Sequence, residues 1–252
     1  MTLRAAARSV FAALTLLALA VPASADDIKV FSSVAMRAVL EELAPRFERE
    51  TGHRVVATFG LAAALKARIE AGESYDLAVL TPAQLDDLIR QGKAAGPRAV
   101  IARTGLGLMV KAGAAKLDVA TVDAFKRTLL AAKSVTYVPA GASGVAFVAT
   151  ARQLGIAEAL APKTRAAASG EEVNTNVTSA AAEVAILPVS EILPVKGAAL
   201  GGVFPAEVQT YIVMGGALSP KASQGARDFL ARLTASASDA VIAAKGMERV
   251  KP

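Results

Sequence analysis

The sequence predicts an α/β fold in which short apolar strands alternate with amphipathic helices. Short apolar stretches recur along the chain, and most are followed by a stretch whose apolar residues have helical spacing. Glycine, proline, serine or threonine marks many of the junctions. This βαβα rhythm indicates a mainly parallel sheet with helices on both faces. The rhythm alone leaves open whether the chain forms one domain or two.

In the first half of the chain, the elements follow each other with short connections. The expected elements are a strand at 28–33, a helix at 36–51, a strand at 55–59, a helix at 62–71, a strand at 76–80 and a helix at 82–90. Thr81 can cap the last of these helices, and Pro82 suits its first turn. Pro45 conflicts with the helix at 36–51, because proline removes a backbone hydrogen bond. We expect a kink or a break there.

The second half continues the same alternation. The expected elements are strands at 105–110, 134–138, 184–187 and 209–213, and helices at 121–131, 144–154, 222–233 and 237–245, with a further helix opening at 171. Thr121 is the expected cap of the helix that follows it. The acidic side chains of Glu171 and Glu172 suit the positive end of their own helix better than a ligand.

Residues 1–25 have the composition of a secretory signal peptide. Arg4 and Arg8 are the positive residues, Val10–Val21 is the apolar core, and Ala23-Ser24-Ala25 has the form of a cleavage site. The sequence therefore predicts cleavage after Ala25 and export. The absence of cysteine excludes a lipid anchor at this site. We expect a periplasmic protein that is free in solution.

Composition narrows the range of functions. The predicted mature chain has a net charge of +4, because the leader takes two of the 28 basic residues and none of the 22 acidic ones. The charges are scattered and aromatic residues make up only 4%, so no nucleic-acid surface is predicted. With no cysteine and one histidine, His53, expected at the surface, we expect no metal, no cofactor and no Ser-His-Asp triad.

Ser32 and Ser33 stand where the first strand ends and the first helix begins. Backbone N–H groups without partners and the positive end of the helix dipole meet at such a junction, so it suits an anion. A serine in this place can equally serve as an N-cap. Both readings stay open from these residues alone.

Several short segments together resemble the type II periplasmic solute-binding proteins, and within them the molybdate-binding proteins. The segments, in order, are Val30-Phe31-Ser32-Ser33, Phe59-Gly60, Ile69-Glu70-Ala71-Gly72, Tyr75-Asp76-Leu77, Val138-Pro139-Ala140-Gly141 and Lys245-Gly246-Met247. The resemblance implies two α/β lobes, joined by two crossing strands, that close on a ligand by hinge motion. Candidate crossing points at Arg103-Thr104-Gly105 and Phe204-Pro205-Ala206 then place residues 26–103 and 206–252 in lobe 1 and residues 104–205 in lobe 2. It also implies a membrane permease of an ABC-type uptake system as partner, and we expect a monomer.

Molybdate itself fits this sequence poorly. The molybdate-binding family has a serine two positions after the first-strand pair, where this chain has Ala35. A second family serine is missing from Gly60-Leu61-Ala62-Ala63, and a family tyrosine is replaced by Pro188. A buried oxyanion without donors costs several kcal/mol. The resemblance therefore favours an organic carboxylate over a molybdate-like oxyanion.

The chain is more similar to a relative of that family, some of whose members resemble aconitate isomerase. The matching residues are Arg103-Thr104-Gly105, Gly141-Ala142-Ser143-Gly144 and Ser190-Glu191. This similarity leaves an isomerase acting on a tricarboxylate as the alternative function. Such an enzyme needs a general base, for which a serine, a lysine or a glutamate such as Glu191 would have to serve.

From these arguments we expect a small anion to be bound in the cleft between the lobes, without a catalytic residue. Arg103 could grip a carboxylate with two hydrogen bonds, and the turn at 141–144 could cradle an anion. The candidate ligand-binding residues are Ser32, Ser33, Gly60, Thr81, Arg103, Gly141, Ala142, Ser143, Gly144, Ser190, Gln209 and Tyr211.

Overall fold

The computed structural model describes residues 25–250. The predicted leader, except for Ala25, lies outside the described residues. Within the described part of the chain, none of the helices combines the length and the apolar character that crossing a bilayer requires.

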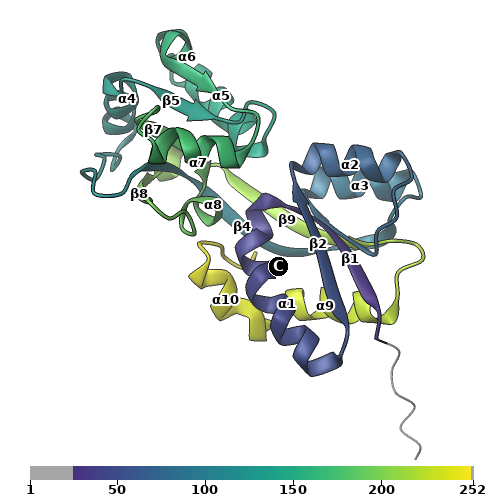
Figure 1. Ribbon diagram of the computed structural model, residues 1–252. Helices are drawn as coiled ribbons and strands as arrows, with labels where there is room; N and C mark the ends of the chain where they lie inside the picture. Colours follow the sequence, from purple (N-terminus) through teal and green to yellow (C-terminus); the bar gives the residue numbers. More distant parts are fainter. Residues whose placement is uncertain (1–24, 251–252) are drawn as a thin grey trace, which may run out of the picture.

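The first lobe is a mixed sheet between two layers of helices (Figure 1). Its strand order is β2-β1-β3-β9-β4, with β1 parallel to β2 and β3, and β9 antiparallel to β3 and β4. Helices α2 and α3 lie on one face, and α1 and α9 on the other. The strands are β1 (Asp27–Ser33), β2 (Arg54–Gly60), β3 (Leu77–Leu80), β4 (Ala95–Lys111) and β9 (Tyr211–Leu218). The helices are η1 (Val34–Met36), α1 (Arg37–Thr51), α2 (Ala62–Glu70), α3 (Pro82–Arg90), α9 (Gln224–Thr234), η4 (Ser236–Ser238) and α10 (Asp239–Ala244).

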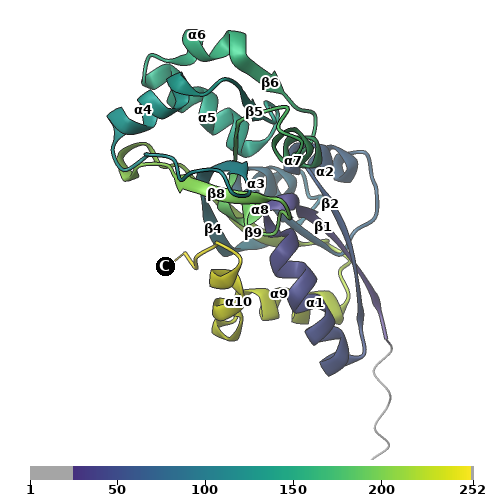
Figure 2. The ribbon, with the colours of Figure 1, turned by 60° about the vertical axis from the view of Figure 1, so that its left-hand side comes forward.

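The second lobe is built around the far half of β4, which continues from the first lobe (Figures 1 and 2). Strands β7 and β8 pair antiparallel with β4, and β5 lies parallel between β7 and β6. The strands are β5 (Val135–Tyr137), β6 (Thr164–Ala166), β7 (Val184–Pro188) and β8 (Ala198–Val203). The helices are α4 (Val122–Ala131), α5 (Ala142–Gln153), α6 (Ala157–Leu160), η2 (Ala161–Lys163), α7 (Gly170–Thr178) and α8 (Val189–Ile192).

Each lobe has an aromatic contact in its core. In the first lobe, the ring of Phe47 on α1 lies 5.0 Å from that of Phe229 on α9, centroid to centroid. In the second, Phe125 on α4 and Phe204 lie 4.6 Å apart. The four side chains are buried, and burying an aromatic side chain contributes roughly 2–3 kcal/mol relative to leaving it exposed.

The structure confirms the α/β fold and most of the expected elements. The predicted strand at 105–110 is the end of the longer strand β4, whose first half contains Gly96 and Pro97 and alternates little in burial. Strands β6 and β8 were not predicted, because β6 is short and exposed and β8 contains two glycines.

The prediction of a break at Pro45 is wrong, since α1 runs through it. The proline faces solvent, where water can bond the carbonyl that loses its partner, and buried residues on both sides of it hold the helix in place.

Two segments cross between the lobes. One is β4, which pairs with β9 up to Gly105 and with β7 and β8 from Leu106 onward. The other runs from Phe204 through η3 (Ala206–Val208) to Tyr211. The lobe boundaries at 103/104 and 205/206 stay a prediction that agrees with this pairing.

The side chain of Gln209 connects the two crossing segments. Its Oε1 accepts a hydrogen bond from the backbone N–H of Leu106 at 2.7 Å, and its Nε2 donates to the carbonyl of Leu106 at 3.1 Å. The side-chain amide of Gln209 thus bonds both backbone groups of Leu106, at the point where β4 passes from the first sheet to the second.

We expect Gln209→Ala to lower the free energy of unfolding by about 1–3 kcal/mol, because it leaves both polar groups of buried Leu106 without this partner. Urea denaturation followed by circular dichroism measures the change. Gln153→Ala, at the exposed end of α5, is the control, and equal losses for the two variants would contradict the role of Gln209.

Candidate functional site

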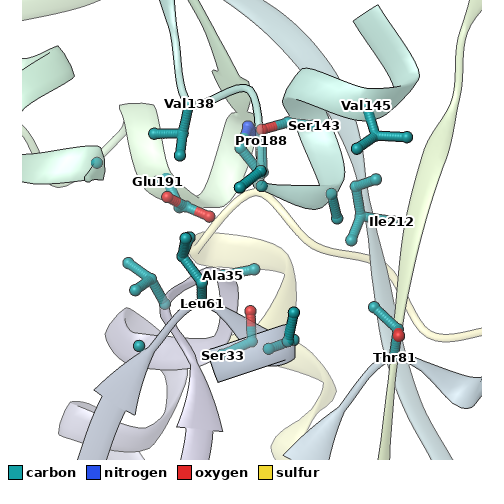
Figure 3. Close-up of a pocket in the computed structure, with 18 of the residues that line it drawn as sticks. Ser33, Ala35, Leu61, Thr81, Val138, Ser143, Val145, Pro188, Glu191 and Ile212 are labelled. Atoms are coloured by element: carbon teal, nitrogen blue, oxygen red, sulfur yellow. The ribbon is translucent and has the colours of Figure 1, made fainter. Parts of the chain in front are cut away.

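A cavity of about 340 Å³ lies between the two lobes. The first lobe contributes Ser33 and Thr81 to its wall, and the second lobe contributes Ser143 and Glu191 from the opposite side (Figure 3). Apolar side chains fill much of the remaining wall, among them Val34, Ala35, Leu61, Val138, Val145, Pro188 and Ile212. The cavity therefore offers a few polar groups on an otherwise apolar surface, which is typical of a small-molecule site.

Three helices of nine or more residues have their N-cap residue on the wall of this cavity. The N-cap residues of α2, α3 and α5 are Leu61, Thr81 and Gly141, and all three line the cavity. None of them caps its helix with a side chain. The predicted cap at Thr81 is wrong, because its hydroxyl is 2.8 Å from Gln84 Oε1 and donates to it instead.

Three other helices have a side-chain cap. Thr121, Ser169 and Ser223 cap α4, α7 and α9 by accepting a hydrogen bond from the third residue that follows. None of these three caps lines the cavity. Helices α2, α3 and α5 thus keep first-turn N–H groups without a side-chain partner, whereas α4, α7 and α9 satisfy one of theirs with a serine or threonine hydroxyl.

The charges around the cavity strengthen this difference. The first turns of α2, α3 and α5 contain no acidic residue, whereas α4 begins with Asp123 and α7 with Glu171 and Glu172. The positive ends of these three helix dipoles are therefore not compensated by acidic side chains in their own first turns. Such an arrangement attracts an anion, which the free N–H groups can bind directly.

The two serines at the end of β1 have different roles. Ser32 is fully buried, and its hydroxyl donates to the backbone carbonyl of Ser33 at 3.1 Å. Ser33 lines the cavity, with its side chain pointing into it (Figure 3). Only the second serine can therefore reach a ligand in the cavity.

The residues of the turn at 141–144 also have two different roles. Gly141, Ala142 and Ser143 line the cavity. Gly144 does not, but a Cβ at this position would stand 1.9 Å from the carbonyl oxygen of Val138. Gly144 is thus needed for the close approach of the two backbone segments. It shapes the turn that presents Ser143 and does not contact a ligand itself.

The expected residues therefore fall into two groups. Those that the structure brings together on the cavity are Ser33, Gly60, Thr81, Gly141, Ala142 and Ser143. The positions where the molybdate-binding pattern has other residues, Ala35 and Pro188, also line it.

The remaining candidates have other partners outside this cavity. Arg103 Nε donates to Glu248 Oε1 at 2.6 Å, and its guanidinium lies 4.1 Å from the centroid of the Tyr211 ring. The expectation that Arg103 faces the cleft is therefore not met. Gln209 is bonded to Leu106, and Ser190 is buried and donates its backbone N–H to Thr104 Oγ1 at 3.3 Å.

Among the residues that the structure describes, Glu191 is the only ionisable one on the wall of the cavity. It lies on α8 and points towards Ala35 and Leu61 on the opposite wall (Figure 3). Burial raises the pKa of its carboxyl group from 4.5 to about 7, although the nearby positive charge of Arg37 acts in the other direction. The carboxyl group therefore changes its charge near neutral pH.

Sequence reasoning considered Glu191 only as a base for the alternative function, and it missed Arg37. Glu191 lies on the short helix α8 and Arg37 is the first residue of the long helix α1, and what each side chain faces depends on how the lobes pack together. The sequence position of Arg37 could have indicated a site residue, because it closely follows the serine pair and lies at the start of the first long helix. The described residues contain no cluster of three or more His, Asp or Glu side chains that could hold a metal ion.

The fold and the cavity define a two-lobed binding protein. The family model of the bacterial extracellular solute-binding proteins matches residues 28–248. The chain belongs to this family, and its fold is that of the type II periplasmic binding proteins.

Known proteins with different names for their function are similar to this chain. The chain is 27% identical, over 88% of both chains, to an aconitate isomerase from a Pseudomonas species. A periplasmic molybdate-binding protein from Azotobacter vinelandii superposes with a TM-score of 0.75 at 21% identity, covering 89% of this chain and all of that one. A sulfate-binding protein from Mycobacterium tuberculosis gives a TM-score of 0.72 at 15% identity, covering 90% and 88% of the two chains.

We expect Glu191→Gln to stabilise the protein at pH 8 but hardly at pH 4. Below the unfolded pKa of 4.5 the carboxyl is protonated in both states, so it contributes no difference. Between pH 4.5 and about 7 the unfolded chain loses this proton more readily, and above pH 7 the folded protein carries the full cost of the buried charge. The gain at pH 8 is up to about 3 kcal/mol.

Urea denaturation at both pH values measures this gain. Glu207→Gln, at an exposed glutamate, is the matched control. A pH-independent difference between Glu191→Gln and the wild-type protein would show that the raised pKa is wrong.

Proposed function

We propose that this protein binds a small organic carboxylate in the cavity between its lobes and delivers it to the membrane permease of an ABC-type uptake system. In this proposal the predicted leader is removed and the protein works in the periplasm. The observation that carries the proposal is the convergence of three helix N-termini, without side-chain caps or acidic residues, on one cavity. The family of solute-binding proteins agrees with it.

The wall of the cavity favours a carboxylate over a tetrahedral oxyanion. A fully buried oxyanion such as molybdate needs donors around its whole surface. Here the hydroxyls of Ser33 and Ser143 lie on opposite sides, and Ala35, Val138 and Ile212 present only apolar surface. An organic anion places its carboxylate at the donors and its carbon skeleton against the apolar wall, so its two parts match the two parts of the cavity.

Binding of this kind needs no cationic side chain on the wall. The positive ends of the helices and the backbone N–H groups supply the field, and closure of the lobes would remove water and strengthen it. An ionised Glu191 would oppose the anion, whereas its protonated form could donate a hydrogen bond to it.

We expect Ser33→Ala and Ser143→Ala each to weaken carboxylate binding by about tenfold, because each removes one hydrogen bond to a charged group. Isothermal titration calorimetry with succinate, butyrate, molybdate and sulfate measures the affinities. Ser223→Ala removes a serine cap far from the cavity and should change stability but not affinity. The proposal fails if the folded wild-type protein binds no carboxylate, or if the Ser223 variant loses as much affinity as the other two.

A second candidate function is an isomerase acting on an unsaturated tricarboxylate. It is favoured by the position of Glu191, whose carboxyl group faces the cavity and has a pKa of about 7, which suits a general base at neutral pH. Aconitate isomerase is also among the similar proteins. For this reaction, Glu191 would remove a proton from a carbon next to the double bond and return it to the other end of the allylic system, while helix N-termini stabilise the developing negative charge.

We expect proton NMR of trans-aconitate incubated with the protein to separate the two functions. An isomerase produces the cis isomer, and Glu191→Gln lowers the rate by at least a hundredfold, because the amide cannot take up the proton. The control is Glu207→Gln, which keeps the rate. If the wild-type protein yields no cis isomer after long incubation, the enzymatic function is excluded and binding alone remains.

A further inference from the structure

A second cavity, of about 290 Å³, lies next to the first one. The two share Val34, Gly170 and Glu191 as wall residues. The second cavity also lies between the lobes, because the start of α1 forms one side and α7 and α8 form the other. Three polar residues line it, Arg37 on the side of α1, and Asn174 on α7 and Ser190 on α8 on the other side.

These three residues have a property that sets them apart. In the part of the chain that the structure describes, three buried side-chain nitrogen or oxygen atoms have no hydrogen-bond partner, and they are Arg37 Nε, Asn174 Oδ1 and Ser190 Oγ. All three residues line the second cavity. A buried polar atom without a partner costs about 1–3 kcal/mol, so three of them around one cavity indicate a site for a polar ligand.

The guanidinium of Arg37 is held in place but not saturated. It lies over the Phe59 ring at 4.7 Å from the centroid. Its Nη2 is 3.8 Å from Glu171 Oε1, which is longer than a hydrogen bond. Arg37 therefore keeps donors free for an acceptor in the cavity, and a guanidinium with free donors is suited to a carboxylate.

The other two residues complete such a site. Ser190 is buried, and its hydroxyl can donate to a carboxylate oxygen. The amide of Asn174 presents either its oxygen or its NH₂ group after a half-turn about its last bond. The other charged groups of the cavity are Glu41, Glu171, Glu191 and Lys196. With Glu191 protonated, two positive and two negative side chains surround the site, so the cavity does not repel an anion.

We propose that Arg37, Ser190 and Asn174 form a second anion subsite, which takes the second carboxylate of a ligand whose first carboxylate lies at the helix N-termini of the first cavity. The ligand class is then a dicarboxylate, whose chain passes Glu191, the residue common to both cavities. This inference rests on the proposed function, because it assumes that the first cavity binds a carboxylate.

Calorimetry at pH 6 with dicarboxylates of increasing length, from succinate to adipate, and with butyrate as the monocarboxylate tests the inference. We expect Arg37→Met to weaken binding of the preferred dicarboxylate by about ten- to a hundredfold, because it removes a charge-assisted contact. Butyrate binding should change by less than about twofold, since it needs only the first cavity. Arg46→Met removes the same charge from an exposed position on the same helix and should leave both affinities unchanged.

Ser190→Ala is a smaller change at the same subsite, and it should weaken only dicarboxylate binding, by about three- to tenfold. Thermal melting establishes that each variant is folded. Equal losses for dicarboxylate and butyrate, no loss in either subsite variant, or wild-type dicarboxylate binding no tighter than that of butyrate would each overturn the inference. Failure of butyrate and every dicarboxylate to bind the wild-type protein would instead refute the proposed function.

Discussion

The structure depends on one strand that belongs to both lobes. β4 is 17 residues long, and it pairs with β9 in its first part and with β7 and β8 in its second part. Because every one of these pairings uses backbone hydrogen bonds, the sheets of the two lobes cannot separate without breaking a ladder. The cavity lies between the two lobes that this strand joins, where the ends of β1, β3 and β7 lead into helices from both sides.

The positions of the helix starts follow from this arrangement. In a parallel βα unit the helix begins at the carboxyl end of the strand, so neighbouring units turn their helix N-termini to the same edge of a sheet. The two lobes face each other with these edges. The same geometry explains why hydroxyls and backbone N–H groups line the cavity while most of the charged side chains lie elsewhere.

Glu191 and Arg37 are the two charged side chains that most affect the electrostatics of the two cavities. They stand on different lobes, and Glu191 belongs to the wall of both cavities. The raised pKa of Glu191 follows from burial, which the positive charge of Arg37 offsets only in part. A carboxyl that is neutral below about pH 7 lets an anion approach a region that would otherwise repel it.

The sequence by itself determined the class of fold, most of the strands and helices, and the strand ends at which part of the site lies. These follow from local patterns, such as the spacing of Val39, Leu40, Leu43 and Phe47 in α1, that hold wherever the segment packs. It also predicted six of the residues that meet on the cavity, because the ends of strands are positions that topology brings together. Only the tertiary structure decided that Ser33 and not Ser32 faces the cavity, that Arg103 bonds Glu248, and that Arg37 and Ser190 line one cavity between the lobes. The physical reason is that a side chain's partner depends on the rotation of each strand and on the packing of one lobe against the other, and no local pattern records either.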